Sequence, residues 1–358
     1  MGTDRRILEL FDIEIPIIQA PMAGPGTPEL AVAVSSAGGL GSLPCAQLDL
    51  QQARASLELI RRETSRPINL NFFCHTPPQA NAERTLNWLA RLAPYYAEFG
   101  IEPDAAAASS GRRAFDADFC TLLEAYRPKV VSFHFGLPQT ELLSRVKAAG
   151  CKIISSATTV AEARWLEQHG CDAIIAMGSE AGGHRGSFLA EDMSRQIGTF
   201  ALLPQVADAV AVPVIAAGGI ADARGIVAAF ALGAAAVQIG TAYLFCPEAK
   251  VSKIYLDALL RAADEDTMIT NVFTGRPARG IVNRLMREQG PLSAFTPQFP
   301  LAAAAVAPLK ARAEAAGSGN FTNLWSGQAV HLAARSRPAG ELTRRLWDEA
   351  SGKLGARG

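Results

Sequence analysis

The stretch PVIAAGGIADARGIVAAFALGAAAVQIGT, residues 213–241, decides the fold class. An apolar run ends in two glycines, a helix-compatible segment follows, and a second apolar run ends in Gly-Thr. Continuously apolar strands separated by helices are typical of a parallel sheet that is covered on both faces. The uncharged segment 226–245 is long enough to span a bilayer, but its first half is helical in pattern and its second half strand-like. We therefore interpret it as a buried helix–strand unit and expect no membrane partner.

The same alternation of strand and helix patterns runs through most of the chain. Apolar runs that end at or near Gly, Pro, Asn, Ser or Thr predict strands at 15–24, 38–44, 67–73, 129–138, 152–159, 172–183, 213–220 and 235–244. From the fourth run onward the spacing is mostly regular, but the step from the sixth to the seventh run is roughly twice the usual one, which leaves room for a long loop. Eight such units predict a (β/α)8 TIM barrel. A doubly wound open sheet is the alternative, and the lack of GxGxxG after the first strand disfavours it.

Residues 251–358 depart from this rhythm, since they combine helix patterns with proline-containing connectors. Barrels often carry an additional piece over the face that holds the active site. We therefore expect a barrel over residues 1–250. Residues 251–358 are expected to form a C-terminal helical lid, or substrate-side subdomain, that also completes the closure of the barrel.

Composition and charge narrow the range of partners. The 358 residues carry no formal net charge, so the sequence gives no indication that the protein binds nucleic acid. The six cysteines are scattered without a CxxC pair, which indicates reduced thiols and gives no support to a zinc site. A secretory signal needs an apolar core close to the N-terminus. The acidic residues Asp4, Glu9 and Asp12 lie there, so we expect no such signal. We expect a cytoplasmic monomer or homodimer that binds a small molecule.

Glycines follow the last two predicted strands, where barrels commonly bind phosphate through backbone N–H groups. Gly218 and Gly219 end one strand, and Gly240 and Thr241 end the next. A phosphate can approach a glycine backbone closely because no Cβ intervenes. The alternative is that these glycines only form tight turns. Their occurrence at two consecutive late strands favours a phosphate site.

The turn GSEAGGHRGS, residues 178–187, follows the sixth predicted strand. Gly182 and Gly183 allow the backbone to approach a flat or bulky ligand, and His184 is a candidate general base. Arg185 either binds an anion or pairs with Glu180. His134 also lies at a strand end and is a further substrate-binding candidate, although neighbouring phenylalanines favour a packed, hydrogen-bonded role.

Several segments together resemble the class I branch of the nitronate monooxygenase family, formerly called 2-nitropropane dioxygenases. The matching pieces are IPIIQAPMAG (15–24), NFF (71–73), SFHFGLP (132–138), GSEAGGHRG (178–186), PVIAAGGIADARG (213–225), AVQIGT (236–241), FTGRPARGI (273–281) and LWSGQAV (324–330). The combination of SFHFGLP with EAGGHRG is specific, whereas GGI and GT occur in many nucleotide-binding barrels.

The resemblance implies an FMN-dependent TIM barrel that oxidises alkyl nitronates, typically propionate 3-nitronate, with O2 to a carbonyl compound and nitrite or nitrate. It implies that His184 is the catalytic base toward neutral nitroalkanes and that Lys310 lies near the substrate. Met177 stands where the family usually has a glutamine that contacts the flavin. The other implied flavin contacts are Ala20, Pro21, Met22, Asn71, Gly182, Gly219, Gln238, Ile239, Gly240 and Thr241.

Other functions remain compatible with the same barrel. An FMN-dependent enoyl-thioester reductase or NAD(P)H:quinone reductase shares the GGH and GGI elements. An IMP dehydrogenase type of barrel needs a cysteine after the sixth strand, and the chain has none between Cys171 and Cys246. A non-catalytic flavin- or phosphate-binding barrel is a further alternative.

Overall fold

The computed structural model describes residues 4–79, 81–102, 112–190 and 192–355. Eight parallel strands follow one another around a single sheet in the order β1-β9-β8-β6-β5-β4-β3-β2. The sheet closes on itself where β2, at one end of this order, meets β1 at the other. There the Gln19 N–H donates to the Leu40 carbonyl at 2.9 Å, and the Leu40 N–H donates to the Ile17 carbonyl at 3.0 Å. The predicted (β/α)8 barrel is confirmed. Its strands are β1 (Ile17–Gln19), β2 (Gly41–Pro44), β3 (Ile68–Phe73), β4 (Val130–His134), β5 (Lys152–Ala157), β6 (Ala173–Met177), β8 (Val214–Ala217) and β9 (Ala236–Ile239).

Helices cover the outside of the barrel, and polar residues placed just before them fix where several begin. Asp49 and Gln52 form a capping box, Thr159 accepts from the Glu162 N–H, and Asp222 accepts from the N–H groups of Arg224 and Gly225. The last outer helix, α13, comes late in the chain and packs between α9 and α2. The outer helices are α2 (Pro28–Ser36), α3 (Leu50–Glu63), α5 (Ala117–Tyr126), α6 (Thr140–Ala148), α7 (Val160–Gln168), α8 (Thr199–Ala209), α9 (Ala223–Ala231) and α13 (Ala339–Gly355).

A short helix, α1 (Arg6–Phe11), covers the end of the barrel where the strands begin. Its side chains Ile7 and Phe11 are fully buried in one cluster with residues near the strand starts, such as Val130 and Ala173. This apolar contact seals one end of the barrel. The other end, where the strands finish, is left for binding.

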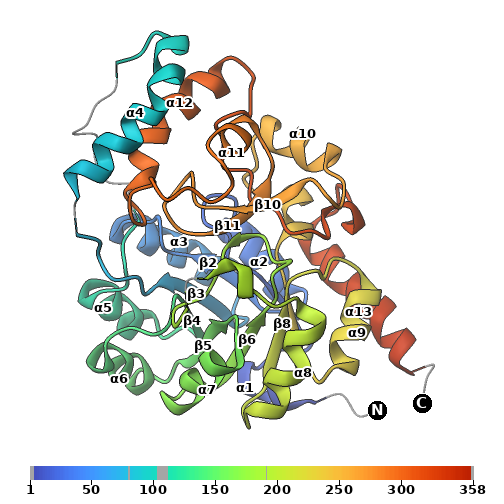
Figure 1. Ribbon diagram of the computed structural model, residues 1–358. Coiled ribbons are helices and arrows are strands. Elements are labelled where there is room, and N and C mark those ends of the chain that lie inside the picture. The colour runs from blue at the N-terminus through green and yellow to red at the C-terminus, as the bar shows by residue number, and fades with distance from the viewer. Residues whose placement is uncertain (1–3, 80, 103–111, 191, 356–358) are drawn as a thin grey trace.

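A second layer lies over the carboxyl ends of the strands (Figure 1). It is not helical alone, because β10 (Thr267–Thr270) and β11 (Ala278–Ile281) form an antiparallel sheet with β7 (Gly183–His184). The crossover between β3 and β4 also contributes α4 (Ala82–Phe99), which packs on α12 around Trp88, Leu309 and Phe321. The remaining elements of this upper layer are α10 (Lys253–Arg261), α11 (Arg284–Glu288) and α12 (Ala302–Ala315). Short 3-10 turns lie at η1 (Met193–Arg195), η2 (Thr241–Phe245) and η3 (Val330–Leu332).

One buried carboxylate ties the loop after β7 to the barrel wall. Glu162, in the first turn of α7, is fully buried. Its Oε1 accepts from the N–H groups of Phe188 and Leu189 at 2.7 and 3.1 Å. Its Oε2 accepts from the N–H and the hydroxyl of Thr158 at 2.6 and 2.8 Å. Four donors therefore depend on this one side chain.

We expect Glu162→Ala to lower the free energy of unfolding by about 3 kcal/mol, because it leaves buried donors without an acceptor. Urea unfolding followed by circular dichroism measures the change. Glu265→Ala, at an exposed position on a loop, is the matched control and should change stability by less than about 0.5 kcal/mol. Equal stability of the two variants would show that the four hydrogen bonds contribute little.

Candidate active site

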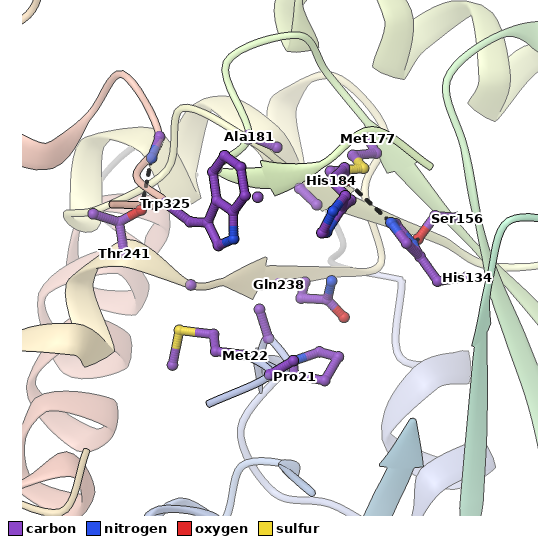
Figure 2. Close-up of a pocket in the computed structure, with 18 of the residues that line it drawn as sticks. Pro21, Met22, His134, Ser156, Met177, Ala181, His184, Gln238, Thr241 and Trp325 are labelled. Carbon is purple, nitrogen blue, oxygen red and sulfur yellow. Dashed lines mark hydrogen bonds between the residues drawn. The ribbon is translucent and has the colours of Figure 1, made fainter. Parts of the chain in front are cut away.

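A cavity opens at the carboxyl ends of the strands, between the barrel and the upper layer (Figure 2). It encloses about 1360 Å³ of empty space, counting the part that is open to solvent. The walls come from the ends of most barrel strands, from the turn after β6, and from the segment 324–329. This is the face on which barrel proteins bind their ligands.

Most of the residues singled out in the sequence line this one cavity, although they lie far apart along the chain. The lining includes Ala20, Pro21, Met22, Asn71, His134, Met177, Gly182, Gly183, His184, Gly218, Gly219, Gln238, Gly240 and Thr241. Ile239, Arg185 and Lys310 are not among the lining residues.

An amide oxygen in the cavity has no partner among the described residues. The Oε1 atom of Gln238 is sealed from solvent and accepts no hydrogen bond from the described residues. In Figure 2 this side chain lies between the loop that holds Pro21 and Met22 and the imidazole of His184. A buried acceptor without a donor costs free energy. The position therefore suits a ligand with an N–H or O–H group.

The glycine turns after β8 and β9 present free backbone donors. Gly218 and Gly219 have φ values of +109° and +71°, which favour glycine. Within the described chain, the N–H groups of Gly219 and Gly240 donate to no other residue. A Cβ at Gly219 would lie in ordinary contact with Glu180, at 3.6 Å. Glycine is needed there for the backbone conformation, and the free N–H groups suit an anion.

The turn after β6 packs directly against the segment 324–329. A Cβ at Gly182 would lie only 2.6 Å from the backbone nitrogen of Gly327, so this position requires glycine. The Gly327 N–H donates to the Thr241 hydroxyl at 2.9 Å, and the Gln328 N–H donates to the Glu180 carbonyl at 3.0 Å. These contacts hold a late segment of the chain over the cavity.

A hydrogen bond to Thr274, which is itself hydrogen-bonded, orients the His184 ring. Its Nε2 lies 3.0 Å from the Thr274 hydroxyl, which in turn donates to the Arg276 carbonyl at 3.3 Å. A hydroxyl has one proton, so a Thr274 that donates to a carbonyl accepts from a protonated Nε2. The neutral ring then carries its lone pair on Nδ1, which has no hydrogen-bond partner among the described residues. Nδ1 is the nitrogen left for a ligand.

His134 supports His184 through the backbone. Its Nε2 lies 3.0 Å from the His184 carbonyl, which can only accept, so Nε2 carries a proton. In the neutral ring Nδ1 therefore accepts from the Ser156 hydroxyl at 3.1 Å. His134 lines the cavity, but its two nitrogens are engaged in positioning the neighbouring loop.

The electrostatic surroundings keep these rings neutral. Burial lowers the pKa of His184 well below its ordinary value, and the nearby charges of Arg112 and Arg276 lower it further. Burial also lowers the pKa of His134 to about 4. His184 is therefore an imidazole with a free lone pair at neutral pH. The positive potential that disfavours its protonation favours an anion beside it.

The structure gives Arg185 and Lys310 roles away from the cavity. The fully buried guanidinium of Arg185 donates to the carbonyls of Met177 and Gly178 at 2.8 and 2.6 Å, so it fastens the end of β6 and neither lines the cavity nor pairs with Glu180. Arg185 also donates to Gln196. The Lys310 ammonium, on α12, donates to Asn323 at 3.2 Å. Their sequence neighbourhood indicated chemistry, but the direction of each side chain depends on tertiary contacts.

Several residues in or around the cavity were not singled out in the sequence. Arg112 and Trp325 line it, whereas Thr274 and Arg276 lie outside the lining, and Thr274 contacts His184. Thr274 and Arg276 lie in FTGRPARGI and Trp325 lies in LWSGQAV, so both stretches held a usable pattern. Arg112 belongs to no recognised motif. The aromatic rings around His184 come from distant segments, with ring centroids 5.2 Å away for Phe299 and 5.4 Å for Trp325.

The fold and the cavity together define a (β/α)8-barrel protein with a small-molecule site that suits an anionic ligand. Comparison with known proteins places it more narrowly. The family model for nitronate monooxygenase matches residues 4–349, and the chain belongs to this family of flavin-dependent oxidoreductases. A nitronate monooxygenase of Paraburkholderia phytofirmans is 44% identical over 96% of this chain and 94% of its own length. One of Pseudomonas aeruginosa is 42% identical over 97% and 99%.

Solved structures share the fold of this chain. A nitroalkane oxidase from Streptomyces ansochromogenes superposes with a TM-score of 0.87 at 36% identity, covering 98% of this chain and 99% of that one. FabK from Thermotoga maritima superposes with a TM-score of 0.74 at 28% identity, covering 99% of each. Among the described residues, no helix is long and apolar enough to cross a membrane.

Proposed function

We propose that this chain oxidises alkyl nitronates with O2 to a carbonyl compound and nitrite or nitrate, using bound FMN. The observation that carries the proposal is the positive potential at His184, which favours an anionic substrate in a chain of this family. The names of the relatives, nitronate monooxygenase and nitroalkane oxidase, support the same reaction.

The cavity residues fit a flavin mononucleotide. The unpaired Oε1 of Gln238 suits a ring N–H, and the free N–H groups of Gly219 and Gly240 suit one phosphate monoester. Ala20, Pro21 and Met22 would lie along one side of the ring. Met177 lines the cavity through a thioether, which donates no hydrogen bond. When bound, the flavin supplies electron transfer and the reaction with oxygen.

The protein itself supplies charge and proton transfer. A nitronate has already lost its α-proton, so the chain needs only to bind the anion in a favourable potential. A neutral nitroalkane must first give its α-proton to a base. The free lone pair on His184 Nδ1 can accept it, and the resulting imidazolium is stabilised by the nitronate formed beside it.

A direct experiment tests the reaction and the cofactor together. We expect the purified protein to be yellow and to release FMN on heating. Titration with propionate 3-nitronate in air should consume oxygen and form nitrite or nitrate. Rapid anaerobic bleaching of the flavin by NADH or NADPH would favour the enoyl-thioester or quinone reductase alternative. A flavoprotein that turns over no nitronate would contradict the proposed function.

His184→Asn should separate two activities, because it keeps a polar side chain but removes the base. We expect turnover of nitroethane to fall by about a hundred- to ten-thousandfold. Turnover of ethyl nitronate should fall much less, because that substrate needs no base. Steady-state kinetics at equal FMN content measures both. Equal loss of the two activities would show that His184 positions the anion.

Thr274→Val should weaken base catalysis without removing the base. The valine cannot accept from Nε2, so part of the imidazole adopts the other tautomer and the pKa of His184 falls further. We expect kcat/KM for nitroethane to fall about tenfold, the value of one lost hydrogen bond of about 1.4 kcal/mol. The acidic limb of the pH profile of kcat/KM should move to lower pH.

Thr274→Ser keeps the hydroxyl and is the matched control, which should retain the wild-type rate and pH profile. Ethyl nitronate turnover should be unchanged in both variants. If Thr274→Ser were as slow as Thr274→Val, packing of the methyl group would explain the loss, and the hydrogen bond would not.

A further inference from the structure

A phenylalanine behind the wall of the cavity has an unusual backbone conformation. Phe135 follows β4 and has a φ of +71°, in the left-handed region that bulky side chains rarely adopt. The buried Ser155 hydroxyl lies 2.8 Å from the Gly136 carbonyl and 3.0 Å from the Phe133 carbonyl, and so holds this turn. Such strain costs free energy and persists only where the surrounding structure enforces it.

The strained turn places the Phe135 ring directly behind two histidines. Its centroid lies 4.5 Å from that of His134 and 6.1 Å from that of His184, the two rings that lie side by side in Figure 2. The guanidinium carbon of Arg276 lies over the face of the same ring, 3.9 Å from its centroid. Phe135 and Arg276 are not among the residues that line the cavity. They can act on a ligand only through the residues in front of them.

Arg276 reaches this position from the upper layer. The residue before it, Gly275, has a φ of +86°, and a Cβ there would overlap the Pro297 carbonyl, so the loop packs closely on its neighbour. The guanidinium donates to the Ser187 carbonyl in the loop after β7. Arg276 therefore joins the upper layer to the loop after β7 and, through Phe135, to the turn after β4.

The charge of Arg276 acts on the imidazole of His184. Burial is the largest cause of the lowered pKa of His184, and the charge of Arg276 lowers it further. The other groups that lower it are Arg112, His134 and His75. Among the described lining residues, Glu180 is the one carboxylate, and it accepts from the N–H and the hydroxyl of Thr199 at 2.8 and 2.9 Å.

We propose that Phe135 is a positioning residue, whose ring fixes the Arg276 guanidinium beside His184 and so directs a positive charge at the imidazole. This rests on the proposed function, in which His184 accepts a proton. A cation is attracted to the face of an aromatic ring, and more strongly where water is excluded. The backbone strain at Phe135 is then retained because a relaxed turn would carry the ring away from the guanidinium.

Phe135→Leu tests the contact, because it keeps an apolar side chain but has no aromatic face. Arg276 disfavours the protonated ring, so a guanidinium that is held less firmly should let the pKa of His184 rise. We expect the proton affinity of His184 in the FMN-loaded protein to increase about three- to tenfold. An NMR titration of the histidine ring C–H signals, assigned with His184→Asn, measures the change. The acidic limb of the kcat/KM profile for nitroethane should move to higher pH.

Two variants serve as controls. Phe135→Tyr keeps the aromatic face and should keep the wild-type titration of His184. Phe321→Leu removes another buried ring that lies under an arginine, Arg284, at 5.8 Å, but outside the cavity lining. It should leave the titration of His184 unchanged.

A double-mutant cycle shows whether Phe135 acts through Arg276. Arg276→Gln removes the charge and should raise the proton affinity of His184 at least as much as Phe135→Leu does. Phe135→Leu should then add nothing to Arg276→Gln. An unchanged titration in Phe135→Leu, or an equal shift with and without Arg276, would reject the proposal and leave Phe135 a packing residue. Phe135→Met, with a flexible side chain, replaces the leucine variant if that variant does not fold.

The titration needs no turnover, so it separates this proposal from the proposed function. The expected shift in a protein that oxidises neither nitroalkane nor nitronate would reject the proposed reaction and support the role of Phe135. An unchanged titration in an enzyme that does oxidise them would reject the role of Phe135 and leave the reaction standing.

Discussion

The backbone of Gly183 and His184 pairs with Arg279 and Ala278 of β11, and the orientation of the imidazole depends on this pairing. The turn after β6 thereby becomes an edge strand of the upper sheet. Thr274, which contacts the imidazole, lies 90 residues away in the sequence. Side chains held by packed strands keep a more defined geometry than side chains on free loops. The upper layer thus orients His184 as well as covering the cavity.

Charge distribution in the cavity follows from the same arrangement. Burial lowers the pKa of His75, His134 and His184, and the charge of Arg276 lowers all three further, so each ring is neutral at pH 7. An anion that enters offsets part of the arginine charge and makes a proton on His184 less unfavourable. Binding of an anion in the cavity and the proton affinity of His184 are therefore coupled. A neutral ligand would gain nothing from this potential.

The barrel was predictable from the sequence because its strands are continuously apolar and end at glycines or polar residues at regular intervals. The same rule located most of the cavity, since the carboxyl ends of parallel strands meet at one face. The upper layer was harder to predict. β10 and β11 are four residues each, and β7 is two, so they show no periodicity above background. Arg185 illustrates the remaining limit, because nothing local indicates that its guanidinium folds back onto the carbonyls of β6.

The position of α13 affects how this protein is made on the ribosome. The helix fills the gap between α9 and α2, and the segment 324–329 closes the cavity just before it in the chain. During synthesis, which releases the N-terminal part first, α2 waits for a partner that emerges some three hundred residues later. Until then an apolar seam of the barrel faces water and the cavity lacks a wall. The cavity therefore gains its last wall only when residues 324–329 have been made, late in synthesis.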